Sequence, residues 1–257
     1  MSRRSGSIKP RVRRAEICDL VARQGKVEVE QLAAHFQASP ETIRKDLARL
    51  DQEGRLRKFH GGAGPVQPRE EGRFAQRMRQ NEVAKRRIAE KLAARISGPH
   101  TLFMDTGSTT LICAEALAGK KGLTIITNSA KIADVFAHGR GGARVYLLGG
   151  LYRGDNAQTV GASVVRHIGL YHADMAILTV GALDVGGFYN FSAQEAEVAR
   201  AMISAAGAVV IVADASKFNH TAPFRLAPLA AADALIADQA PDTALMAALD
   251  DGGVELG

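Results

Sequence analysis

The fold of the N-terminal part of this chain is decided by one stretch, Ser39-Pro40-Glu41-Thr42-Ile43-Arg44-Lys45-Asp46-Leu47. A serine followed by a proline is a strong helix start, because the hydroxyl caps free amides and proline fits the first helical position. Beyond that start, Ile43, Leu47 and Leu50 recur at the spacing of one helical face. The stretch therefore predicts a helix with one buried apolar stripe.

The opposite face of this helix is rich in cations. Thr42, Arg44, Lys45 and Arg49 point outward, mostly from its first turns. The major groove of DNA accepts a helix, and in helix-turn-helix proteins the N-terminal residues of the second helix contact base edges. Arg44 can bind guanine through two hydrogen bonds, whereas Lys45 and Arg49 can hold phosphates.

The residues before this helix complete a helix-turn-helix. Apolar spacing predicts a helix over about residues 13–24 that ends at Gly25, a brief extended piece over 26–29 and a second helix over about 29–36. Gln37 then stands where such turns often carry glycine. A left-handed conformation at this residue would cost about 1 kcal/mol.

A basic segment follows the third helix. Arg55-Leu56-Arg57-Lys58-Phe59 interleaves cations with apolar residues, and His60-Gly61-Gly62 ends the run. This pattern predicts a wing, which is a small hairpin with cations on one face.

The net charge is divided unevenly along the chain. Residues 1–97 hold 23 Lys and Arg against 12 Asp and Glu, a net of +11, whereas residues 98–257 hold 10 against 15, a net of −5. Such a surface attracts a polyanion at one end. Basic residues that only solvate exposed helices would give the same count, so the helix-turn-helix pattern decides between the two interpretations.

Composition predicts three regions: residues 1–60, a linker over 61–73 and a second domain over 74–257. The linker carries glycines and prolines and has no hydrophobic period. Apolar residues at helical spacing then predict one long helix from about Phe74 to Ile96. Its basic residues are expected to form a solvated face of a helix packed on the second domain, with DNA contact as the alternative.

From residue 101 onward, short apolar runs alternate with helical patterns, which is typical of an α/β fold with a mostly parallel sheet and helices on both faces. The predicted strands are residues 101–104, 123–127, 145–148, 175–180, 209–213 and 234–237. The predicted helices are residues 110–118, 130–137, 193–206 and 243–249. In such folds, ligands bind beyond the carboxyl ends of the strands.

Small and hydroxylated residues follow several of these strands. The first strand leads into Asp105-Thr106-Gly107-Ser108-Thr109-Thr110 and a helix, so that glycine, hydroxyls and helix amides can form a cradle for an anion. The next strands end at Thr127-Asn128-Ser129, at Gly149-Gly150-Leu151-Tyr152 and at Gly181. Ordinary turn chemistry explains any one of these ends, but four at one edge of a sheet favour a pocket.

Two charged residues join this edge. Lys217 follows a strand, where it can neutralise a phosphate or simply be solvated. Glu195 begins a helix, where it can accept hydrogen bonds from sugar hydroxyls or favour the positive end of that helix. Spacing alone leaves both alternatives open.

The chain resembles the DeoR family of transcription regulators over about residues 13–240. The segments that carry the similarity are Gln31-Leu32-Ala33, residues 39–47, Leu50, Gly54, His60-Gly61-Gly62-Ala63, residues 105–110, Thr127-Asn128-Ser129, Leu148-Gly149-Gly150, Gly161, Glu195-Ala196-Glu197-Val198 and Asp214-Ala215-Ser216-Lys217-Phe218. The resemblance implies a winged helix-turn-helix over 1–60 and a sugar-isomerase-like sensor domain over 74–257. It further implies a repressor of a sugar or polyol catabolic operon that is relieved by a phosphorylated metabolite.

The residues and the resemblance together predict two sets of contacts. The predicted contacts to double-stranded operator DNA are Ser39, Glu41, Thr42, Arg44, Lys45, Arg49, Arg57, Lys58 and His60. The predicted contacts to a phosphorylated sugar or polyol effector are Asp105, Gly107, Ser108, Thr109, Thr110, Thr127, Asn128, Gly149, Gly150, Tyr152, Gly181, Glu195 and Lys217. Because one recognition helix contacts only a few base pairs, a homo-oligomer, at least a dimer, is expected.

A second hypothesis is a phosphosugar isomerase-like enzyme with an accessory DNA-binding domain. Asp105, Glu195 and Lys217 would then do acid–base work. The attached helix-turn-helix, and the lack of a further carboxylate cluster near the loop to complete a catalytic set, favour the regulator.

Other classes are disfavoured by composition. No apolar run approaches the roughly 18–20 residues of a membrane span, and the basic N-terminus has no apolar stretch of a secretory signal behind it. Cys18 and Cys113 lack metal-like spacing, and the histidines are scattered. We therefore expect a cytoplasmic protein with no metal site and no cofactor.

Overall fold

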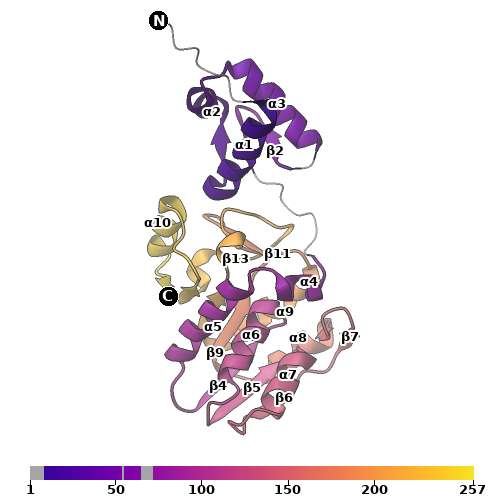
Figure 1. Ribbon diagram of the computed structural model, residues 1–257. Coiled ribbons are helices and arrows are strands. Elements are labelled where there is room, and N and C mark those ends of the chain that lie inside the picture. The colour runs from indigo at the N-terminus through magenta and orange to yellow at the C-terminus, as the bar shows by residue number, and fades with distance from the viewer. Residues whose placement is uncertain (1–8, 54, 65–71) are drawn as a thin grey trace, which may run out of the picture. The chain divides into compact units, whose positions relative to one another are not determined.

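The computed structural model describes residues 9–53, 55–64 and 72–257 (Figure 1). Contacts divide the chain into two compact units, residues 1–68 and 69–257. Each unit is described by itself.

The N-terminal unit is a winged helix-turn-helix. Its helices are α1 (Pro10–Gln24), α2 (Val29–Phe36) and α3 (Pro40–Gln52). A three-stranded antiparallel sheet in the order β1-β3-β2 consists of β1 (Val27–Glu28), β2 (Arg57–Phe59) and β3 (Gly62–Gly64). Ile17, Leu32 and the predicted stripe of α3 form its core. The three predicted helices and the wing are confirmed.

The predicted linker begins too early. Residues 62–64, assigned from their glycines to the linker over 61–73, form β3 between the other two strands. Gly62 is required there, because a Cβ atom on it would lie 2.2 Å from the carbonyl oxygen of Val27. The glycines thus allow close strand pairing, and residues 65–71 of the predicted linker lie outside the described residues.

The single helix predicted over 74–96 is wrong, because the structure has two helices, α4 (Phe74–Arg79) and α5 (Glu82–Arg95). The break falls at Asn81, which has a left-handed φ of 53°, a conformation that asparagine tolerates better than most residues. The side-chain nitrogen Nδ2 of Asn81 donates to the carboxylate of Asp214 at 2.9 Å and to the hydroxyl of Ser216 at 3.1 Å. A contact 133 residues away in the sequence therefore fixes the bend.

The second unit is built on a seven-stranded sheet in the order β15-β14-β12-β9-β4-β5-β6, and every adjacent pair is parallel. The strands are β4 (His100–Met104), β5 (Leu123–Thr127), β6 (Arg144–Leu147), β9 (Ala173–Thr179), β12 (Ala206–Val212), β14 (Ala234–Ile236) and β15 (Glu255–Leu256). The α/β class and all six predicted strands are confirmed, and β15 was not predicted.

Helices cover both faces of this sheet, as predicted. Successive residues of β4 alternate between the two cores: Leu102 and Met104 pack into one, and Phe103 packs into the other. Together with α5, the helices α6 (Ser108–Leu117) and α7 (Ala130–Ala137) pack on the first face (Figure 1). The other face receives α8 (Ala162–Ile168), α9 (Ala193–Ser204) and α10 (Thr243–Asp251).

The strand order places a switch point between β4 and β9. From β4 the chain proceeds through β5 to β6 on one side, and from β9 it proceeds through β12 and β14 to β15 on the other. Ligands of open parallel sheets bind at such a point, beyond the carboxyl ends of the strands. The loops that follow β4 and β9 are therefore the first place to look for a site.

Short strands at the periphery were not predicted. Strand β7 (Leu151–Arg153) pairs with β8 (Gln158–Val160), and β11 (Gly187–Asn190) pairs with both β10 (Ala182–Asp184) and β13 (Phe224–Ala227). Two short 3-10 helices, η1 (Ala215–Lys217) and η2 (Leu229–Ala231), complete the unit. Over the described ranges, none of the helices has the length and apolarity needed to cross a membrane.

Candidate functional site

The start of α3 is held by its predicted cap. The Ser39 hydroxyl accepts a hydrogen bond from the Thr42 amide at 3.2 Å and lies 2.9 Å from the Thr42 hydroxyl. Gln37 adopts the left-handed conformation with φ of 49° and ψ of 42°. These contacts fix the angle at which α3 follows α2, so they set the direction of the outward face of α3.

That outward face carries the predicted cations. Arg44, Lys45 and Arg49 are all exposed. The guanidinium of Arg44 lies 3.9 Å from the carboxylates of both Glu30 and Glu41. Exposed ion pairs contribute only about 0–1 kcal/mol, so these side chains can exchange a carboxylate for a DNA phosphate at little cost.

Asp46, in the middle of the same motif, has a different role. Its carboxylate is nearly buried and accepts hydrogen bonds from Arg13 at 2.6 Å and from Arg14 at 3.2 Å. The pair ties α1 to α3, so Asp46 supports the recognition helix from behind. Sequence analysis missed this pair, although an aspartate next to the apolar stripe of a basic helix was a signal for it.

The wing presents its cations to solvent. Arg57, Lys58 and His60 are exposed, and the Lys58 amide donates to the carboxylate of Asp51 at 3.0 Å. The Nζ atom of Lys26 lies 4.8 Å from the centre of the Phe59 ring. Lys26 therefore covers the Phe59 ring, and the basic side chains of the hairpin are accessible to solvent.

In the second unit, the loop after β4 leads into the start of α6. The first helical hydrogen bond runs from the Leu111 amide to the Gly107 carbonyl at 3.0 Å, so the amides of Ser108, Thr109 and Thr110 precede the helical ladder. The residue at the N-cap position is Gly107, which has no side chain with which to cap these amides. Gly107 is required, because a Cβ atom there would lie 2.2 Å from the side chain of Thr179.

A buried lysine lies at this N-terminus. Lys85 of α5 is only 3% exposed, and its Nζ atom donates to the Ser108 hydroxyl at 3.0 Å and to the main-chain carbonyl of Arg77. A recess here is lined by Arg77, Lys85, Ser108, Thr109 and Lys217 among others. We call it the α6 recess.

Sequence analysis included Lys217 in the site but missed Lys85 and Arg77. Lys85 precedes Ile88 by three residues and Leu92 by seven, so it lies on the buried stripe of α5. A lysine at such a position was the signal that could have identified it. For Arg77, the sequence offers no such pattern.

Glu195 lies on the other side of Arg77, at the first turn of α9. Its carboxylate oxygen Oε1 accepts hydrogen bonds from the side-chain amides of Asn156 at 3.1 Å and Gln158 at 2.6 Å. The Ser192 hydroxyl accepts a hydrogen bond from the Glu195 amide at 3.3 Å, so the helix cap holds the residue in place.

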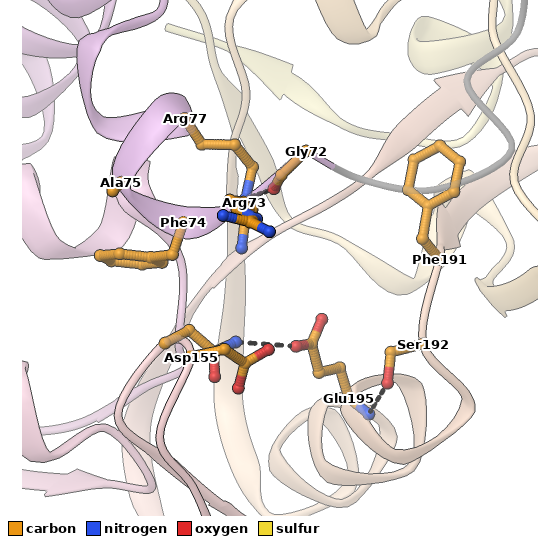
Figure 2. A pocket seen from close by; sticks show the side chains of 10 residues that line it. Gly72, Arg73, Phe74, Ala75, Arg77, Asp155, Phe191, Ser192 and Glu195 are labelled. Atoms are coloured by element: carbon orange, nitrogen blue, oxygen red, sulfur yellow. Dashed lines mark hydrogen bonds between the residues drawn. The ribbon is translucent and has the colours of Figure 1, made fainter.

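Glu195 faces a cavity of about 670 Å³, which we call the α4 cavity (Figure 2). The cavity is lined by Gly72, Arg73, Phe74, Ala75, Arg77, Asp155, Asn156, Phe191, Ser192 and Glu195. Figure 2 shows Arg77 reaching into it from α4 and Glu195 from the opposite wall. A second small recess, lined by Arg77, Asp105, Asn128, Gln158, Thr179 and Glu195 among others, adjoins it.

Several predicted effector contacts shape the sheet edge. The Asp105 carboxylate accepts hydrogen bonds from the Thr179 amide at 3.2 and 3.1 Å, which joins the ends of β4 and β9. The Thr110 hydroxyl donates to the Asp105 and Gly107 carbonyls at 3.1 and 3.2 Å. The Thr127 hydroxyl accepts from the Ser129 amide at 3.0 Å. These three side chains hold the loops in position.

The buried side chain of Asn128 holds two segments together and also lines a recess. Its amide nitrogen donates to the Thr159 carbonyl at 2.9 Å, and its oxygen accepts from the Thr106 hydroxyl at 3.2 Å. It also lines the small recess beside Glu195.

Seven predicted effector residues do not line these cavities, namely Gly107, Thr110, Thr127, Gly149, Gly150, Tyr152 and Gly181. Gly149, Gly150 and Tyr152 are exposed near the β7–β8 hairpin, and Tyr152 is 57% exposed. Gly181 is buried, and its amide donates to the Tyr189 carbonyl at 2.9 Å. A Cβ atom on Gly150 would lie 2.5 Å from the side chain of Val164, and one on Gly181 would lie 2.7 Å from the ring of Phe191. Close packing therefore explains why Gly150 and Gly181 stand at these positions and not a residue with a side chain.

The two units together define a DNA-binding transcription regulator with a sensor domain. Residues 13–69 match the family model of the DeoR-like helix-turn-helix domain, and residues 80–239 match that of the DeoR C-terminal sensor domain. The chain belongs to the DeoR family of transcriptional regulators.

Individual relatives agree with this assignment. The chain is 32% identical to the glycerol-3-phosphate regulon repressor of Escherichia coli, over 93% of this chain and 95% of that one. It is 31% identical to the E. coli HTH-type transcriptional repressor CsqR, over 95% and 94% of the two chains. A crystal structure of ribose 5-phosphate isomerase A from Neisseria gonorrhoeae is similar over 56% of each chain, with 21% identity and a TM-score of 0.41.

The similar full-length proteins are repressors, so the regulator hypothesis is supported over the isomerase hypothesis. The chain is a regulator and not an enzyme. Burial raises the pKa of the Cys113 thiol to about 12, so this thiol is protonated at neutral pH.

Proposed function

We propose that α3 binds an operator, and that a phosphorylated sugar or polyol bound in the second unit releases the protein from it. One observation carries the proposal: Arg77, Lys85 and Lys217 line the same recess as the amides at the start of α6. A phosphate monoester carries up to two negative charges, and burial of those charges requires amide donors and cations. The relative named as a glycerol-3-phosphate regulon repressor is consistent with a ligand of this class.

The ligand would extend from the α6 recess toward Glu195. Arg77 lines the α6 recess, the α4 cavity and the small recess between them. With its phosphate at the start of α6, a sugar or polyol would place its carbon chain beneath Arg77. Its hydroxyls would then reach the wall formed by Glu195.

The hydrogen bond from Lys85 to the Arg77 carbonyl supplies a coupling device. The α6 recess has a volume of about 30 Å³, room for about two water molecules, so a phosphate must displace something to enter. If Lys85 turns to the phosphate, the last turn of α4 loses this contact. The residues that connect the two units lead into α4. A change in α4 on ligand binding would therefore be passed along the chain to the N-terminal unit and alter its affinity for DNA. A ligand shifts DNA affinity only through unequal binding to the two states, typically by about 1–3 kcal/mol.

The DNA-bound form would be a homo-oligomer, at least a dimer, because one α3 helix covers too few base pairs for useful affinity. We place the chain in the cytoplasm, because its relatives named as repressors are from Escherichia coli, whose chromosome lies in that compartment. Residues 1–68 alone, which form the N-terminal unit, should bind DNA weakly and sediment as a monomer. A truncated protein that bound as tightly as the full chain would contradict the oligomer proposal.

The proposal is tested with Lys217→Ala and Ser108→Ala variants. DNA selected from a random pool by the wild-type protein serves as operator in a gel-shift assay, and calorimetry identifies the ligand among sugar and polyol phosphates. Both variants should bind operator normally but fail to release it when ligand is added. Lys121→Ala, at an exposed lysine before the amino end of β5, is the matched control and should respond normally. Ordinary ligand release by the Lys217 or Ser108 variant would place the pocket elsewhere.

A further inference from the structure

Two buried amide side chains beside Glu195 have oxygen atoms that bind nothing. Asn156 and Gln158, at the β7–β8 hairpin, are each 4% exposed. Within the part of the chain that the structure describes, Oδ1 of Asn156 and Oε1 of Gln158 have no hydrogen-bond partner. A buried polar atom without a partner costs about 1–3 kcal/mol, so such atoms are rare in folded proteins.

Glu195 fixes the orientation of both amides. Its Oε1 atom accepts from the amide nitrogens of Asn156 and Gln158 at 3.1 and 2.6 Å. An ionised carboxylate is an acceptor only, so rotating either amide by 180° would bring two oxygens together. The carbonyl oxygens therefore point away from Glu195, and both are acceptors that need a donor.

These acceptors lie where the effector would end. Glu195 lines the α4 cavity (Figure 2) together with Asn156. Gln158 and Glu195 line the small recess beside it. Arg77 and Thr179 connect that small recess with the α6 recess. A ligand whose phosphate binds at the start of α6 can thus reach both amides.

We propose that Asn156 and Gln158, oriented by Glu195, accept hydrogen bonds from two hydroxyl groups of the effector and so determine its specificity. The inference rests on the proposed function and narrows its ligand class. The effector carries at least two hydroxyls remote from its phosphate. A second phosphate or a carboxylate does not satisfy these two oxygens, because such groups are acceptors and not donors.

The first test compares ligands on the wild-type protein. Calorimetry is run with glycerol 3-phosphate, ribitol 5-phosphate and glucitol 6-phosphate, and with propyl phosphate and inorganic phosphate as probes that lack the hydroxyls. The best polyol phosphate should bind at least about 10-fold more tightly than propyl phosphate. Equal binding of propyl phosphate and every polyol phosphate would overturn the inference without any variant.

The second test removes each acceptor with an apolar side chain of similar size. Asn156→Leu and Gln158→Met should each weaken binding of the best polyol phosphate about 10-fold, while binding of propyl phosphate and inorganic phosphate stays unchanged. The unchanged binding of these probes also shows that the variants are folded. Gln194→Met, at a half-buried glutamine on the same first turn of α9 whose amide oxygen accepts from Arg153, is the matched control and should keep wild-type affinities.

The outcomes separate this inference from the proposed function. If both variants retained the wild-type ratio of polyol phosphate to propyl phosphate affinity, the inference would be wrong and the phosphate site would stand. If the wild-type protein bound no phosphorylated compound, the proposed function would fail and the inference with it.

Discussion

The two units of this chain hold the cations of their proposed sites in opposite ways. In the N-terminal unit Arg44 is exposed, and its contacts with Glu30 and Glu41 are 3.9 Å long. In the second unit Lys85 is 3% exposed and donates hydrogen bonds to two fixed oxygens. A DNA duplex is an outer surface that side chains must reach, whereas a small anion has to leave water and needs a cation already in place. Substitution of an exposed cation should therefore change the affinity for DNA alone. Substitution of a buried charged group should change the stability of its unit or the affinity for the effector.

The largest effect is expected at Asp46, the buried charge in the DNA-binding unit. Asp46→Ala removes the carboxylate that pairs with the nearly buried Arg13 and should lower the free energy of unfolding of this unit by about 3 kcal/mol. All four tyrosines lie beyond residue 145 and the chain has no tryptophan, so hydrogen exchange in α1 and α3 is the suitable measurement. Glu53→Ala removes the exposed partner of Arg49 and should change the free energy of unfolding of this unit by less than about 1 kcal/mol. Unchanged protection in the Asp46 variant would show that the pair is dispensable.

The next largest effect concerns the buried cation. Lys85→Met should weaken binding of the phosphorylated ligand by about 2 kcal/mol, roughly 30-fold, and leave operator binding intact. Calorimetry and the gel-shift assay measure the two affinities. Lys91→Met is the matched control, because Lys91 lies on the same helix but donates to the Ala237 carbonyl at 2.7 Å and does not line the recess. Equal loss in both variants would indicate general damage to α5.

A smaller effect is expected on the exposed face of α3. Arg44→Ala should weaken operator binding by about 1.5 kcal/mol and relax the preference for one base, if its contact to guanine is bidentate. Binding to DNA substituted at each position in turn identifies that base. Wild-type affinity of this variant would refute the assignment of the recognition helix.

Lys45→Ala serves as the contrasting variant on the same face. A phosphate contact carries no sequence information, so this change should weaken specific and non-specific binding equally. The dependence of affinity on salt concentration should become less steep, because one fewer counterion is released.

The smallest effect concerns the turn between α2 and α3. Gln37 has a φ of 49°, which costs about 1 kcal/mol for a non-glycine residue, and the gain from glycine is partly offset by its greater freedom in the unfolded chain. Gln37→Gly should therefore stabilise the N-terminal unit by about 0.5 kcal/mol. Gln31→Gly, within α2, should destabilise it by about 1 kcal/mol. A loss of stability in the Gln37 variant would mean that the glutamine side chain contributes to the turn.

Local patterns were sufficient to predict most of the regular structure. Ser39 with Pro40 marked the start of α3, and the stripe of Ile43, Leu47 and Leu50 gave its buried face. The strands β4, β5, β9, β12 and β14 are largely apolar runs because both faces of the sheet are covered there, whereas the edge strand β6 is mostly exposed. The small strands were missed, since β7 is exposed along its whole length and three residues give no period.

Long-range contacts account for what was missed. The bend at Asn81 depends on Asp214, and the orientation of Gln158 depends on Glu195, 37 residues away. Neither pairing is marked by the sequence around the two residues. The loop after β4 was predicted to be an anion cradle from its own residues, whereas the lysine that contacts it comes from a helix 23 residues earlier.

The pairing of β4 with β9 has a consequence for the order of folding. The Asp105 carboxylate and the Thr179 amide that join these strands are 74 residues apart. During synthesis, the centre of the sheet therefore cannot close until the chain has left the ribosome as far as Thr179. Contacts between distant residues also slow folding, because the loop between them must be closed first. The helix-turn-helix forms from contacts within residues 1–68. We expect refolding to show a fast phase in the N-terminal unit and a slower one in the sheet, which pulsed hydrogen exchange would resolve.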